Sequence, residues 1–74
     1  MTANQFRAAL DRLGLSQLGA ARLFGTGERT PRRWALGERS VPPAIAILLR
    51  LLIAGKIGVE DIASVRKKAP GLQR

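Results

Sequence analysis

The chain has 74 residues, with thirteen Lys and Arg against five Asp and Glu, and a formal net charge of +8 at pH 7. A chain of this length forms one domain and buries only about 60% of the surface that its unfolded form exposes. Aromatic residues make up 4% of a chain rich in aliphatic residues, which favours a small all-α bundle over a sandwich. The absence of cysteine excludes a disulfide framework and a thiolate metal site. The excess positive charge indicates a polyanionic partner, nucleic acid first and an anionic membrane surface second.

The N-terminal segment carries the signals of an amphipathic helix over residues 3–13. Thr2 and Gln5 have the spacing of a capping box, in which each side chain bonds to the backbone of the other residue. Gly14 follows and ends the helix. The apolar residues recur at helical spacing and share one face; they are Phe6, Ala9, Leu10 and Leu13. We expect this helix to pack beneath the two that follow.

Two short helices joined by a glycine-containing turn follow the first helix. Ser16 is a suitable N-cap for a helix over residues 17–24. Gly25 follows this helix at the position where the backbone often adopts left-handed angles, which glycine adopts most easily. The next helix, over about residues 28–36, carries three arginines, with Trp34 opposite them in the helical register. We therefore expect Trp34 to lie in the core rather than to stack on a base. This arrangement is the layout of a helix-turn-helix.

The residues of this stretch also carry a resemblance to a known family. They are Leu15, Ser16, Gln17, Ala21, Gly25, Arg29, Thr30, Arg33, Trp34 and Gly37. In this register the chain resembles the lambda-repressor/Cro-like (XRE-type) helix-turn-helix DNA-binding family over about residues 5–52. The resemblance implies an all-α, five-helix domain whose third helix enters the major groove of double-stranded DNA. It further implies a transcriptional regulator, a repressor or autorepressor of a small phage or mobile-element operon.

Pro31 departs from the family pattern, which usually has a β-branched apolar residue there, and it leaves two starts open for the third helix. If Gly27 is the N-cap, Pro31 is the fourth helical residue and loses the first intrahelical hydrogen bond, at roughly 3 kcal/mol for an interior proline. If Thr30 is the N-cap, Pro31 stands at the first helical position, where proline is favoured. We expect the earlier, family-like start, near Glu28, with a distorted or 3₁₀ first turn.

The resemblance also implies which side chains contact DNA. Its pattern turns Glu28, Arg29 and Arg33 toward base edges, and an arginine fork pairs well with guanine O6 and N7. Alternatives stay open for each group. Glu28 accepts a hydrogen bond from a cytosine amino group, or it only interacts with the helix dipole or with Arg29. Gln17 contacts phosphate or only fills a first-turn position, and the arginines contact DNA or form a solvated basic face. Candidate phosphate contacts, which fix register without reading sequence, are Gln17, Thr26, Thr30, Arg32, Arg39 and Ser40.

Residues 44–54 are apolar except for Arg50, and the segment is far shorter than the roughly 20 residues that cross a bilayer. A helix that is apolar nearly all round has to be covered on more than one face. We assign one stripe to the core, namely Ile45, Leu48, Leu49 and Leu52. Gly55 ends this helix, and Glu60 and Asp61 mark the start of a fifth. The domain is expected over residues 1–68, with a flexible tail over residues 69–74.

A second apolar stripe of the same segment, with further apolar residues beyond it, predicts a homodimer interface. The second stripe is Ile47, Leu51 and Ala54, and the residues beyond it are Ile57, Ile62 and Val65. One short helix hardly covers all of this surface, and a large exposed apolar patch usually marks an interface. A two-fold dimer would bind a pseudo-palindromic operator. The alternative is that the fifth helix folds back and seals the second stripe, which leaves a monomer.

Catalysis has little support, because the chain has no His or Cys and no phosphate-cradling glycine loop, so we expect no enzyme, metal or cofactor. An antitoxin-type protein-binding module that also represses its operon is the main alternative, although few residues follow the fifth helix. A cationic membrane-surface peptide would need a basic stripe beside residues 44–54, which hold one arginine. RNA binding lacks a motif with exposed aromatic residues. A polar N-terminus without a signal peptide, together with the missing cysteines, predicts a cytoplasmic protein.

Overall fold

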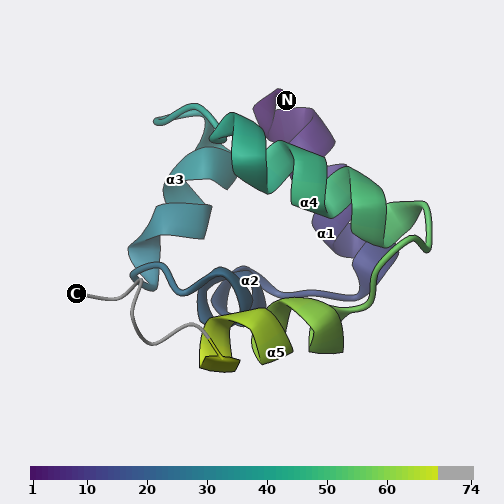
Figure 1. Ribbon diagram of the computed structural model, residues 1–74. Helices are drawn as coiled ribbons and strands as arrows, with labels where there is room; N and C mark the ends of the chain where they lie inside the picture. The colour runs from purple at the N-terminus through teal and green to yellow at the C-terminus, as the bar shows by residue number, and fades with distance from the viewer. Residues whose placement is uncertain (69–74) are drawn as a thin grey trace.

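The computed structural model describes residues 1–68, and these residues form five helices and no strand (Figure 1). The helices are α1 (Ala3–Leu13), α2 (Gln17–Phe24), α3 (Arg29–Leu36), α4 (Pro43–Ile53) and α5 (Val59–Lys68). Helices α1 and α4 pack together, α2 and α5 pack together, and α3 contacts both α1 and α2. The predicted all-α class is confirmed. The flexible tail predicted over residues 69–74 lies outside the described residues.

The predicted caps are present at the ends of α1 and α2. The Thr2 hydroxyl accepts a hydrogen bond from the Gln5 amide at 3.1 Å, and the Thr2 amide donates to the Gln5 side chain at 2.8 Å, which completes the capping box. Gly14 then ends α1 in the left-handed region, with φ of 67°. The Ser16 hydroxyl accepts from the Gly19 amide at 2.8 Å at the start of α2. Local hydrogen bonds therefore fix these helix ends without help from the rest of the fold.

Helix α3 begins between the two starts that the sequence left open. Glu28 is its N-cap residue, has helical backbone angles and makes no side-chain capping bond. Pro31 is consequently the third helical residue, where the backbone amide has no intrahelical partner in any helix, so the expected loss of a hydrogen bond is not incurred. The Thr30 amide donates to the Gly27 carbonyl at 3.1 Å, a bond of the 3₁₀ type that tightens this turn as predicted.

The core lies where α1, α3 and α4 meet. Phe6 and Leu49 are fully buried, and Trp34 is 4% exposed. The rings of Phe6 and Trp34 meet edge to face, with centroids 5.6 Å apart and planes at 88°. Such a pair contributes about 0.5–1.5 kcal/mol beyond the burial of its area. The predicted core position of Trp34 is confirmed.

Helix α4 turns part of the predicted stripe to the core. Leu49 and Leu52 are buried as predicted, and Ile45 packs partly buried against the core. Leu48 was also assigned to the core but is half-buried and lines a groove beside α5, whereas Ala46 is buried in its place. A helix that is apolar at nearly every position offers no period that fixes its rotation more closely. The helix has Pro43 at its first position, where proline is favoured, and Ala54 is its C-cap residue. None of the helices described is long and apolar enough to cross a membrane.

Candidate nucleic-acid interface

Helices α2 and α3 pack against each other across a tight turn. Gly25, in the left-handed region with φ of 70°, ends α2, and the Thr26 amide donates to the Ala21 carbonyl at 3.0 Å. Ala20 and Ala21 are the buried residues of α2, and each presents only a methyl group to its neighbours. Small side chains allow close approach of neighbouring helices, which fixes the position of α3 relative to α2.

The inner face of α3 is buried and its outer face is basic. Pro31, Trp34 and Ala35 are buried in the core, and they lie three and one residues apart on the helix. Three arginines lie on the outer face, and all are exposed; they are Arg29, Arg32 and Arg33. Because Pro31, Trp34 and Ala35 pack in the core, they fix the rotation of the helix about its axis and keep the arginines in solvent. The fold therefore presents a short helix with a fixed cationic face.

The three arginines of α3 line one hollow of about 370 Å³, together with Leu36 and Glu38. Within the residues that the structure describes, none of the three guanidinium groups makes a hydrogen bond or an ion pair. Fifteen donors, five on each guanidinium, are therefore directed to solvent. An unpaired cluster of this kind repels itself in the free protein and gains from an anionic partner.

The loop after α3 carries two further predicted contacts. The Glu38 and Arg39 amides both donate to the Arg33 carbonyl, at 2.9 and 3.3 Å. These bonds hold the backbone of Arg39 against the end of α3, and its side chain is exposed, as is Ser40. Glu28 is exposed at the other end of the helix. The predicted residues of this loop and of the helix start thus flank the arginine hollow without lining it.

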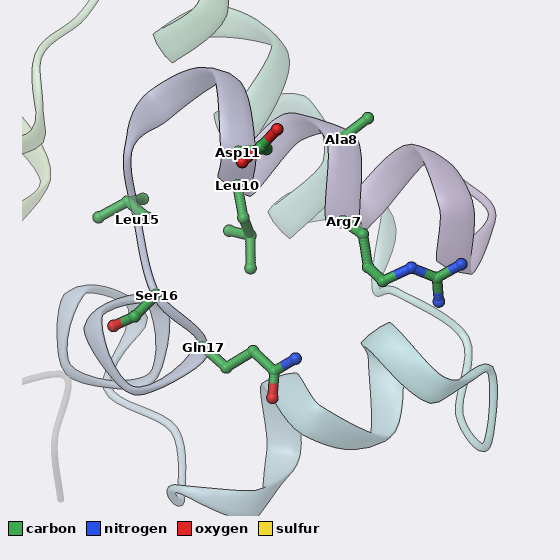
Figure 2. Close-up of a pocket in the computed structure, with 7 residues that line it drawn as sticks. All are labelled: Arg7, Ala8, Leu10, Asp11, Leu15, Ser16 and Gln17. Carbon is green, nitrogen blue, oxygen red and sulfur yellow. The ribbon is translucent and has the colours of Figure 1, made fainter.

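Gln17 lies in a second hollow of about 470 Å³, between α1 and the start of α2. Figure 2 shows the Gln17 side chain on one side of this space and Arg7, from α1, on the other. Gln17 is exposed, whereas Thr26 and Thr30 are half-buried in the turn and the first turn of α3. The structure does not bring these three predicted phosphate contacts into the arginine hollow.

Arg7 has a role that the sequence does not indicate. Its guanidinium donates to the Ala35 carbonyl near the end of α3 and to the Asn4 side chain. The last carbonyls of a helix have no intrahelical partner, so an arginine that binds one of them closes the helix end. Arg7 thereby links α1 to the cationic helix. Only its position on the polar side of the first helix was visible in the sequence, and this is a position where most residues face solvent.

The predicted dimer residues fall into two groups. Leu51, Ile57, Ile62 and Val65 line an apolar groove of about 420 Å³ with Phe24, Ile45, Leu48 and Asp61. Ile47, which is 55% exposed, and Ala54 are on the surface of the α4 segment and do not line the groove. Helix α5 therefore packs on α2 and leaves a groove open between itself and α4.

No protein-family model matches the chain, and neither a curated protein nor a solved structure matches it.

Proposed function

We propose that the chain is a sequence-specific DNA-binding protein of the lambda-repressor-like helix-turn-helix type, which acts as a transcriptional repressor or autorepressor. The observation that carries the proposal is the cluster of three unpaired arginines on the outer face of a short helix whose inner face is locked in the core. A net charge of +8 adds a long-range attraction toward a polyanion.

The dimensions of α3 suit the major groove of duplex DNA. An α-helix with its side chains is about 10–12 Å in diameter, and the groove is about 12 Å wide. Arg29 and Arg33 are four residues apart, so their side chains emerge one above the other on one face. An arginine fork forms two hydrogen bonds to guanine O6 and N7, and we assign this role to these two residues.

The remaining cationic residues position the protein on the duplex and do not read its bases. Arg32 lies to one side of the face formed by Arg29 and Arg33, and Arg39 is fixed just beyond the helix end. From these positions each can bind a phosphate beside the groove, which orients the protein without discriminating between bases. Gln17, at the first position of α2, is the corresponding candidate on the other side.

Selection from a randomised duplex library with the purified protein tests the proposal. We expect enrichment of one short motif, and loss of that enrichment in Arg33→Ala. Arg50→Ala is the matched control, because it removes the same charge from an exposed position in a hollow between α1 and α4. Selection that enriches no motif, or that both variants weaken equally, would leave only non-specific attraction by net charge.

We also propose that a second copy of the chain covers the groove between α4 and α5. Val65 lines the groove and is 66% exposed, so the rim of the groove is apolar and accessible. A two-fold contact needs one patch that is complementary to itself, and an apolar groove with an exposed apolar rim satisfies this condition. The dimer would present two α3 helices to two half-sites of a pseudo-palindromic operator.

A further inference from the structure

Leu36 is the last residue of α3 and is out of place for a leucine. It is 57% exposed, although α3 is the helix with the most complete separation of buried and basic residues. It lines the same hollow as Arg29, Arg32 and Arg33. The cationic surface of α3 thus contains one apolar site.

The spacing on the helix places Leu36 within the proposed reading face. It follows Arg29 by seven residues and Arg33 by three, which are separations of residues on one helix face. Arg29 and Leu36 are separated by about 10 Å along the axis, at 1.5 Å per residue. Because a helix in the major groove turns one face toward the base edges, a pose that places both arginines there keeps Leu36 at the groove as well.

From this arrangement we infer that Leu36 selects for a thymine by contact with its 5-methyl group, an inference that rests on the proposed DNA binding. The thymine methyl is the one apolar group that a base pair exposes in the major groove. A phosphate gains nothing from contact with the leucine side chain, whereas a methyl group and the leucine remove each other from water. Leu36 would act at one base position, next to those read by Arg29 and Arg33.

Uracil in place of thymine is the sharpest probe, because it removes the methyl group and keeps every hydrogen-bonding atom. Each thymine of the selected duplex is replaced in turn, and affinities are measured for the wild type, Leu36→Asn and Leu36→Met. For the wild type we expect one position at which uracil weakens binding about fourfold, as burial of one methylene-sized group predicts. Leu36→Asn should bind thymine and uracil duplexes equally, and Leu36→Met should keep the preference.

Val59→Asn is the matched control, since Val59 is exposed and lies at the start of α5, outside the arginine hollow. It should keep the full preference for the thymine methyl. The inference is overturned if no thymine is sensitive, or if Leu36→Asn keeps the same sensitivity as the wild type. In both cases the wild type still binds its selected duplex, so only the role of Leu36 is lost. If the proposed DNA binding itself is wrong, the wild-type protein enriches no duplex in the preceding selection.

Discussion

Trp34 decides whether the cationic helix has a fixed orientation. The ring is buried against Phe6 on the side of α3 opposite the arginines. Truncation of a buried aromatic residue to alanine costs about 3–5 kcal/mol. The whole free energy of unfolding expected for a domain of this length is roughly 4–11 kcal/mol.

We therefore predict that Trp34→Ala melts far below the wild type or does not fold, as measured by circular dichroism during heating. Leu18→Ala is the control, because Leu18 is an exposed leucine on α2 and its loss should change stability by less than about 0.5 kcal/mol. A Trp34→Ala protein that keeps its melting temperature and loses only DNA binding would show that the ring is a contact residue.

The arginines are predicted to differ in the kind of loss they cause. Arg33→Ala should weaken binding to the selected duplex by about 1–3 kcal/mol and relax the preference at one base position. Arg39→Ala should weaken binding to all duplexes alike, because a phosphate contact carries no sequence information. Anisotropy titrations against the selected duplex and its single-base variants separate the two patterns. If Arg33→Ala and Arg39→Ala bind every duplex with the same affinity as Arg50→Ala, α3 is not the element that reads DNA.

At the scale of the helices, α1 contacts α3 through the polar side chain of Arg7 as well as through the Phe6 ring. Arg7 donates both to the Ala35 carbonyl and to Asn4, so it joins the end of α3 to the first helix. Hydrogen bonds that involve a charged group contribute about 1.5–3 kcal/mol when shielded, and an exposed arginine contributes less.

We predict that Arg7→Ala lowers the free energy of unfolding by about 1 kcal/mol, measured by urea denaturation. Arg12→Ala provides the comparison, since Arg12 is an exposed arginine on the same helix and should have a smaller effect. Equal stabilities for the two variants would mean that the bond to Ala35 does not hold α3.

Helix ends were predictable from sequence where the signal is local. Thr2 with Gln5, and Ser16, bond to backbone amides within one turn of their own position, and the structure places them as expected. The start of α3 was less accessible, since Glu28 makes no capping bond and Pro31 fits more than one register. The face of α4 was only partly accessible. Leu49 and Leu52 were correctly placed in the core, but a helix that is apolar at nearly every position gives no period that separates Leu48 from Ala46.

In the candidate site, too, the features with a local sequence signal were predictable and those that depend on distant contacts were not. The exposure of Arg29, Arg32 and Arg33 follows from the helical period once Trp34 is placed in the core. The contribution of Arg7 depends on a contact across 28 positions of the chain, which no local pattern encodes. Leu36 was overlooked because a leucine suggests the core, although its spacing from Arg29 and Arg33 places it on the same exposed face.

At the scale of the whole molecule, the proposed dimer sets the geometry of the operator. We predict that the free protein sediments as a dimer and that Val65→Glu sediments as a monomer, because each copy would bury a charge in the other's groove. Val65 is exposed, so the variant should keep its fold. Val59→Glu places the same charge on α5 outside the groove and should remain a dimer.

The selected motif should then be an inverted repeat whose half-sites lie one helical turn apart, about 34–36 Å between centres. A wild-type monomer that protects a single asymmetric half-site would contradict the dimer. So would a Val65→Glu protein that still sediments as the wild type does.

The most direct test of DNA recognition by α3 is the affinity for the selected duplex and for a scrambled duplex of the same composition, measured across a series of salt concentrations. We predict tighter binding to the selected duplex at every concentration and a linear fall of log K with log salt, with a slope of about 0.9 for each phosphate neutralised. Arg39→Ala should lower that slope by about 1. Equal affinity for the two duplexes at every salt concentration would contradict sequence-specific recognition by this helix.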